Sequence, residues 1–584
     1  MFRPIPDALA GSLTLTALVA MLPLLTLFVM LGVLRLAAWK AAAASLIMSL
    51  LVAIVIYSMP TGQALMAGAE GAAFGFFPIM WVVINAIWVY NMTVVTGHFD
   101  VLRRSFARIS DDQRIQAVII AFCFGALLEA LAGFGTPVAI TSVMLIALGF
   151  RPLKAATVAL VANTAPVAFG ALAVPITTLA AVTGLPEREL SQIVGRQTPL
   201  LGIFVPMALV YIIDRGRGVR ITLPATLTAG LAFAVAQFAT SNYLSTQLTD
   251  IVAALAGALA VVVLLRFWQP ASGYVESAEE DFAEAHPHVR KHVGVESHVI
   301  EGVPAASVGG ADHPIGHGTG TVDELAARDA GRHDSRADVI RAYAPYLIII
   351  VVFSITQLPA IQRLLNAPTV TFKWPGLDLQ TAAGKPSTLP TFRLNWLAAA
   401  GSLMLISGLL TIPAIRISPA KAFRSYLDTY KQLGAAIFTV MAVLGLAYVM
   451  NASGQTATLG SWLAGAGAAF ALLSPILGWI GVAVTGSDTS SNSLFGALQV
   501  SAARDIGLPP ALMAAANTSG GVLGKMISPQ NLAIAAAAVG MSGREGDIFR
   551  KVVGWSLGFL VFMVLLVYLQ STPVLSWMLP VMTP

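Results

Sequence analysis

The sequence predicts an all-α polytopic membrane protein with about 12 to 14 transmembrane segments. Of its 584 residues, 57% are hydrophobic and 11% are charged, and the mean hydropathy is +0.79. Apolar runs recur along nearly the whole chain at about the 20 residues that a bilayer-crossing helix needs. Glycine, proline and polar residues interrupt some of these runs, which further predicts two inverted repeats, each with a re-entrant hairpin and a discontinuous helix.

The first apolar run, residues 13–34, is expected to be an uncleaved span, because residues 1–7 carry one arginine and no clear small-residue cleavage site. Unbroken spans are expected further along the chain near residues 41–59, 71–95, 199–213, 222–240, 251–267, 340–358, 396–415, 433–451 and 552–570. Basic residues gather between several of these spans, at 35–40, 97–114, 215–220, 416–431 and 544–551. The positive-inside rule places these segments in the cytoplasm, which requires the N-terminus to lie outside.

A polar segment at residues 269–338 divides the chain into membrane halves at 1–268 and 339–584. The segment holds 13 acidic and 5 basic residues and seven of the eight histidines. Low hydrophobicity and a net negative charge predict a mostly disordered cytoplasmic linker. Its histidines lack a recurring ligand spacing, and Cys123 is the only cysteine, so neither a metal site nor a disulfide is expected. Positive-inside loops explain the basic excess elsewhere without a nucleic-acid partner.

The first half contains two interrupted elements in succession. Residues 115–151 carry Glu129 and then glycine and proline at 133–137, which predicts a hairpin that returns to the cytoplasmic side. Residues 155–181 are interrupted by Asn-Thr-Ala-Pro at 163–166 and by Gly170, which predicts a discontinuous crossing.

The second half contains the corresponding polar stretch, residues 482–530. It includes Asp488 and Lys525 between apolar segments, so both charges are expected at membrane depth. A charge near the bilayer centre costs roughly 2.5 to 3.5 kcal/mol even on insertion scales, which suggests a functional role. Broken backbone at that depth is tolerated only when it is buried in protein or lines a water-filled cavity.

Aligning the two halves at a constant offset of 354 matches residues 163–175 with residues 517–529. Asn-Thr, Gly and Pro coincide without a gap, and each half has its hairpin shortly upstream. The loop count has the first pair entered from the cytoplasm and the second from outside, as in an inverted repeat. Paired interruptions of this kind predict a transport site near the membrane midplane.

Half-helix N-termini facing one another could hold a small carboxylate, because they carry partial positive charge and unpaired N–H groups. Hydroxyl and amide side chains can bond to carboxylate and hydroxyl oxygens, and a lysine can offset the substrate's charge. The substrate-binding candidates are Gly133, Gly135, Thr136, Asn163, Thr164, Ser487, Thr489, Ser490, Asn492, Asn517, Thr518, Lys525, Ser528 and Gln530. No catalytic residue and no cofactor is expected.

Three strings in these stretches resemble the L-lactate permease family, which includes the glycolate permeases: residues 129–140 (EALAGFGTPVAI), 485–496 (TGSDTSSNSLFG) and 524–530 (GKMISPQ). The resemblance runs through nearly the whole chain. It implies a bacterial inner-membrane permease for L-lactate, with D-lactate and glycolate as further substrates, coupled to protons. Asn531, where a small residue is expected, and the His-rich linker depart from the family pattern, and both are expected to lie away from the site.

Symport of a lactate anion with a proton is electroneutral, whereas an anion entering alone works against about 2.3 kcal/mol per 100 mV. Glu129 and Asp488 are the proton-coupling candidates, because each sits beside a helix break and desolvation favours the neutral carboxyl. The hypothesis is that one of them takes up the proton while Lys525 and the helix ends hold the lactate.

Structural roles remain open for the same residues. Asp488 and Lys525 could form an ion pair with each other, and Glu129 could bond backbone amides freed at 133–137. The run of Ser, Thr and Asn could serve as interhelical glue. Glu70 and His98 are expected at membrane interfaces and receive no role.

Other functions are also open. Asp488, Thr489 and Ser490 could form a sodium site in a sodium-coupled carboxylate symporter, and a passive anion channel is a further alternative. An enzyme is not expected, because no nucleophile with a base and no metal cluster lies at membrane depth. The expected partners are the monocarboxylate, protons and the lipid bilayer, and homo-oligomer formation is left open.

Overall fold

The protein is a bundle of apolar helices, as the sequence predicts. The computed structural model describes residues 2–5, 7–34, 36–107, 109–131, 133, 135–274, 334–356, 358–380, 387 and 389–580. Within these residues, nine helices are long and apolar enough to cross a membrane, or ten if one bent pair counts as a span. This confirms the all-α polytopic class, while the total of 12 to 14 segments stays a prediction. Residues 275–333 of the predicted linker lie outside the described residues.

The first membrane half opens with a series of packed helices. They are α1 (Leu13–Ala20), α2 (Leu22–Phe28), the π-helical turn η1 (Val29–Val33), α3 (Ala38–Val55), α4 (Thr61–Phe74), the π-helical turn η2 (Gly75–Met80), α5 (Trp81–Val95) and α6 (His98–Ala107). Helix α4 corrects the expected boundary of the span at 71–95, since the crossing begins at Thr61. Glu70, which is expected at a membrane interface, is buried within the bundle.

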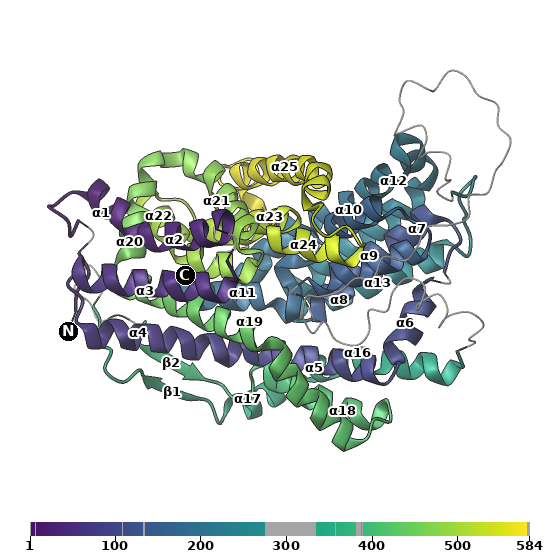
Figure 1. Ribbon diagram of the computed structural model, residues 1–584, viewed down its shortest axis with the longest axis horizontal. Helices are drawn as coiled ribbons and strands as arrows, with labels where there is room; N and C mark the ends of the chain where they lie inside the picture. The colour runs from purple at the N-terminus through teal and green to yellow at the C-terminus, as the bar shows by residue number, and fades with distance from the viewer. Residues whose placement is uncertain are drawn as a thin grey trace.

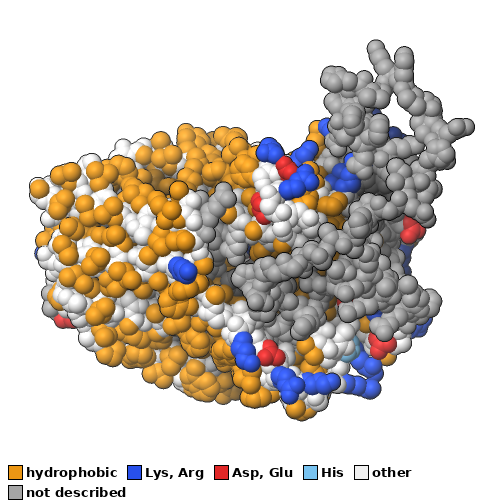
Figure 2. All heavy atoms as spheres, viewed as in Figure 1, with side chains coloured by type: hydrophobic (Ala, Val, Ile, Leu, Met, Phe, Trp, Pro, Cys, Tyr) orange, Lys and Arg blue, Asp and Glu red, His pale blue; other side chains and the backbone are white. Residues whose placement is uncertain are grey.

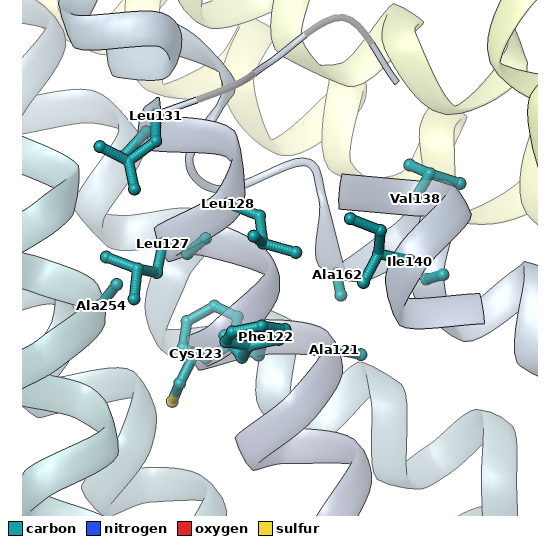
Figure 3. Packing of buried hydrophobic residues seen from close by; sticks show 14 of the residues in the cluster. Ala121, Phe122, Cys123, Leu127, Leu128, Leu131, Val138, Ile140, Ala162 and Ala254 are labelled. Atoms are coloured by element: carbon teal, nitrogen blue, oxygen red, sulfur yellow. The ribbon is translucent and has the colours of Figure 1, made fainter. Parts of the chain in front are cut away.

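The first hairpin and the first broken crossing follow. The hairpin consists of α7 (Gln113–Ala117), η3 (Val118–Phe124) and α8 (Gly125–Leu131) on one arm and α9 (Thr136–Ala147) on the other. The crossing consists of α10 (Pro152–Ala162), the 3-10 turn η4 (Val167–Phe169) and α11 (Gly170–Thr183), and it is bent by 63° at its break. Figure 3 shows Leu127 and Leu128 of α8, Ile140 of α9 and Ala162 of α10 packed in one apolar cluster, which holds the hairpin against the crossing.

The first half closes with α12 (Glu187–Ala239), η5 (Thr240–Leu244) and α13 (Thr249–Leu264). Helix α12 is interrupted at Asp214 and Arg215, which have non-helical backbone angles. Asp214 there accepts a hydrogen bond from the buried Arg114 at 2.8 Å, so an ion pair fixes this turn to α7.

The second half contains helices and one small sheet. Its elements are α16 (Arg336–Ile355), α17 (Pro359–Asn366), β1 (Val370–Lys373), β2 (Thr391–Leu394), α18 (Ala400–Ala414), α19 (Pro419–Ser453), α20 (Gln455–Leu463), η6 (Ala464–Ala469), α21 (Phe470–Thr485), α22 (Asp488–Ile506), α23 (Pro510–Gly524), η7 (Lys525–Ile527), α24 (Pro529–Ala538), α25 (Glu545–Gln570) and η8 (Ser576–Met578). Strands β1 and β2 pair antiparallel, with Val370 opposite Leu394. They lie between the spans expected at residues 340–358 and 396–415.

The two hairpins lie toward opposite ends of the molecule. Helices α7 to α9 lie in its right-hand part, whereas α21 and α22 lie in its left-hand part (Figure 1). Hydrophobic side chains cover most of the visible left-hand surface, and most of the visible Lys and Arg lie in the right-hand half (Figure 2). This arrangement fits hairpins entered from opposite sides of a membrane and basic loops on one side. The inverted repeat itself stays a prediction.

Glycines hold α21 and α23 in backbone contact. A Cβ on Gly520 would lie 2.1 Å from the carbonyl oxygen of Pro475, and a Cβ on Gly478 would lie 2.0 Å from that of Asn517. Small residues permit this close approach of membrane helices. The second hairpin and the second broken crossing therefore form one packed unit.

Gly520→Ala is expected to lower the free energy of unfolding by about 1–3 kcal/mol, because the added methyl group has no space. The matched control is Gly558→Ala in α25, where a Cβ would meet nothing within 4 Å. The measurement is the melting temperature of the purified proteins in detergent. Equal melting temperatures for the two variants would contradict the close contact.

Candidate functional site

A buried ion pair joins the two halves at their helix breaks. Lys525, in η7 between α23 and α24, donates from Nζ to Oε1 of Glu129 in α8 at 2.5 Å. Both residues are buried, at 7% and 3% exposure. Removing one partner of such a pair leaves an uncompensated buried charge, so each group constrains the other.

Asn163 completes this cluster from the first broken crossing. Its Nδ2 donates to Oε2 of Glu129 at 3.0 Å, so the carboxylate receives one bond on each oxygen. Gly170 permits this placement, since a Cβ there would lie 2.8 Å from Oε1 of Glu129. Glu129 thus accepts hydrogen bonds from two side chains. The alternative that it bonds backbone amides freed at 133–137 stays a prediction.

Two polar atoms beside this cluster lack a partner among the described residues. They are Oδ1 of Asn163 and Oγ1 of Thr164, and both residues are buried. A buried polar atom without a hydrogen bond costs about 1–3 kcal/mol. These atoms therefore have hydrogen-bonding capacity available for a ligand.

Asp488 does not pair with Lys525, which corrects that alternative. Neither carboxylate oxygen has a hydrogen-bond partner among the described residues, and Asp488 is only 3% exposed. The side chain lies against α23, where a Cβ on Gly521 would be 2.3 Å from Oδ1. Asp488 is therefore a buried carboxylate with unused hydrogen-bonding capacity.

Asn492, Asn517 and Thr518 form a second cluster, between α22 and α23. Oδ1 of Asn492 accepts from Nδ2 of Asn517 at 2.9 Å and from Oγ1 of Thr518 at 3.0 Å, and Nδ2 of Asn492 donates to the carbonyl of Pro175 at 3.0 Å. Gln499 donates to Oδ1 of Asn517 at 2.9 Å. These hydrogen bonds join α22 to α23 and to α11, as in the interhelical alternative. Few polar atoms of this cluster are therefore left to bond a substrate.

Two of the three serines predicted to bind substrate, Ser487 and Ser528, cap helices. Oγ of Ser487 accepts from the backbone N–H of Ser490 at the start of α22, and Oγ of Ser528 accepts from that of Asn531 at the start of α24.

Thr136 is the first residue of α9 and is half-buried, as is Thr489 in the first turn of α22. Gly133 and Gly135 both have positive φ, which glycine adopts without strain. Gln530, by contrast, is exposed, so it is not enclosed with the others.

Both hairpin tips contact the second break. A Cβ on Gly135 would lie 3.4 Å from Oδ1 of Asn531, and one on Gly486 would lie 2.6 Å from Oε1 of Gln530. Asn531 is buried and donates from Nδ2 to Oγ of Ser528 at 2.8 Å and to the carbonyl of Lys525 at 3.2 Å. The departure from the family pattern at residue 531 therefore lies within the site, against expectation, and helps to hold Lys525.

Sequence comparisons with known proteins show the family of this chain. The family model described as L-lactate permease matches residues 16–574. The chain belongs to the L-lactate permease family. It is 38% identical over 592 residues to the L-lactate permease of Bacillus subtilis (strain 168), covering 98% of each chain. It is 40% identical over 574 residues to glycolate permease GlcA of Escherichia coli (strain K12), covering 96% of each.

Among solved structures, Neisseria gonorrhoeae MtrF aligns over 87% of this chain and 84% of that chain, at 14% identity and a TM-score of 0.46. That likeness is too weak to carry an inference. Membership of the lactate permease family, together with the apolar helices, makes the chain a multi-pass membrane transporter and not an enzyme.

Sequence reasoning about this permease missed several buried polar residues. Asp250 and its partner Gln237 are fully buried in α13 and α12, and Oγ1 of Thr178 in α11 has no partner among the described residues. Asp250 directly precedes the span expected near residues 251–267, so the sequence places its carboxylate outside that span. A polar Thr-Asp pair directly before an apolar run is the signal that could have placed it in the first turn of the helix.

Lys525→Met in this permease is expected to lower the free energy of unfolding by about 3–5 kcal/mol, because Glu129 is left as a buried charge. The double variant with Glu129→Gln is expected to recover part of that loss. The comparison is Arg550→Met, which breaks an exposed pair with Asp547 and should change stability little. The measurement is the melting temperature in detergent. Equal values for Lys525→Met and Arg550→Met would show that the buried ion pair does not contribute to stability.

Proposed function

We propose that this protein takes up L-lactate across the bacterial inner membrane together with a proton, and that D-lactate and glycolate are further substrates. Family membership supports the class of substrate, because relatives at 38% and 40% identity are named L-lactate permease and glycolate permease. The observation that carries the coupling is the ion pair of Glu129 and Lys525 at the junction of the two breaks.

Charge balance at Lys525 provides the coupling. In the resting arrangement the carboxylate of Glu129 is the partner of the ammonium group. A proton arriving alone would neutralise Glu129 and leave Lys525 unpaired, and lactate arriving alone would place two carboxylates beside one cation. Each imbalance costs several kcal/mol in a buried site. Arrival of both leaves one ion pair, with the lactate carboxylate in place of Glu129.

The remaining side chains have roles that follow from their unused bonds. Asn163 and Thr164 can bond the carboxylate or the hydroxyl group of lactate through their free oxygens. Asp488 is buried without a partner, which favours a protonated carboxyl that can donate a hydrogen bond to the substrate. Glu129 is therefore the proton carrier in this proposal, and Asp488 is the second candidate.

Vesicles reconstituted with Glu129→Gln are expected to lose accumulation of radiolabelled lactate driven by an imposed pH gradient, by about tenfold or more, while lactate exchange falls less. Asp488→Asn, which keeps a neutral hydrogen-bonding group, is expected to weaken binding but to retain pH-gradient-driven accumulation. Sodium-free buffers and a protonophore are the controls, and glycolate, pyruvate and succinate are the competitors.

Normal accumulation by both variants would overturn the proton role of both carboxylates. Loss in Asp488→Asn alone would move that role from Glu129 to Asp488. Accumulation by the unaltered protein that requires sodium would support the sodium-coupled alternative, and uptake that never exceeds equilibrium would support a passive channel.

A further inference from the structure

Asp250 is a carboxylate with no role in the transport steps so far. It lies in the first turn of α13 with no exposed surface. Its Oδ1 accepts from Nε2 of Gln237 at 2.7 Å, and its Oδ2 has no partner among the described residues. A fully buried ionised carboxylate with one neutral donor is costly, so a structural purpose alone accounts for it poorly.

Gln237 connects Asp250 to the break of the first crossing. Its Nε2 also lies 3.5 Å from the carbonyl oxygen of Ala165, in the polar turn next to Asn163 and Thr164. Its Oε1 is 3.3 Å from Oγ1 of Thr198 in the same helix, which fixes the orientation of the amide. Asp250 is thus held beside the backbone that positions Asn163.

Helix α13, which carries Asp250, packs against α8, which carries Glu129. Ala254, one turn after Asp250, lies beside Leu127 of α8 (Figure 3). Helix α13 also packs against α11, α12, η3 and η5. Among the other described residues packed on α13, Cys123 of η3 is titratable, but it lies two turns away against Gly257.

Asp250 also lies close to the predicted outer surface. The loop before α13 contains Gln247, whose Nε2 donates to Oε1 of Glu187 at the start of α12 at 2.8 Å. Positive-inside reasoning places this loop outside the membrane. Asp250 therefore lies between outer loops with polar side chains and the carboxylate of Glu129.

We propose that Asp250 relays the proton from the outer side to Glu129. The proton first binds the unpartnered Oδ2 of Asp250, which neutralises that carboxylate. It then moves to the carboxylate of Glu129, so Asp250 regains its negative charge and Glu129 releases Lys525. This inference rests on the proposed proton symport, and it adds a positioning and relay residue that does not touch the substrate.

The test uses Asp250→Asn in reconstituted vesicles, with net lactate uptake under a pH gradient and lactate exchange measured side by side. Net uptake is expected to fall about tenfold more than exchange, because exchange returns a lactate without requiring a net proton transfer. The dependence of net uptake on external pH is also expected to change. The matched control is Glu70→Gln, since Glu70 is equally buried with an unpartnered Oε2 but lies on α4, packed against α19.

An unchanged ratio of net uptake to exchange in Asp250→Asn, with the pH profile of the unaltered protein, would overturn the relay. Equal losses of both activities would also overturn it, because they indicate a structural role shared by the two processes. Failure of the unaltered protein to accumulate lactate under a pH gradient would instead refute the proposed symport. Melting temperatures of both variants distinguish misfolding from loss of the relay.

Discussion

A lysine buried between two broken helices must have one anionic partner at all times. Lys525 meets this constraint through Glu129, and the partner comes from the other half of the chain. The pair therefore ties the two halves together. In the proposed coupling it also controls substrate binding, because neutralising Glu129 leaves Lys525 without an anionic partner until another carboxylate binds. A small monocarboxylate fits that role by charge. The same interaction thus serves the fold and the proposed coupling.

The surrounding fold makes this pair possible by close backbone approach. Gly170 leaves space for the Glu129 carboxylate, Gly521 leaves space for Asp488, and glycines between α21 and α23 bring the second hairpin onto the second crossing. The cluster of Asn492, Asn517 and Thr518 uses its hydrogen bonds to fix that unit. The side chains of this cluster therefore have most of their hydrogen bonds made within the protein. Asn163, Thr164 and Asp488, by contrast, have polar atoms without a hydrogen-bond partner among the described residues. We infer that this second set of residues is where substrate is held.

The helical class and the positions of the breaks could be predicted from sequence, because glycine, proline and charge in apolar runs have few explanations at membrane depth. The partner of Lys525 could not be predicted from sequence. Glu129 and Asp488 are both acidic residues beside helix breaks, and only the tertiary packing shows which of them contacts the lysine. Asp250 and Glu70 were missed for a related reason. Each stands at the edge of an apolar run, where sequence leaves the helix boundary uncertain by a few residues, and the structure shows that both side chains are buried against neighbouring helices. The role of Asn531 was misjudged because its side chain bonds to Gly486, at the tip of the second hairpin, and to Lys525, in the break.

The most direct test of this account is proton uptake by the purified protein on lactate binding, measured in weakly buffered detergent solution with a pH indicator. The account predicts that about one proton is bound with each lactate, because the substrate carboxylate replaces an ionised Glu129 beside Lys525. Glu129→Gln should bind lactate without this uptake. Lactate binding by the unaltered protein with no proton uptake would contradict the central claim, since Lys525 would then hold two carboxylates at once.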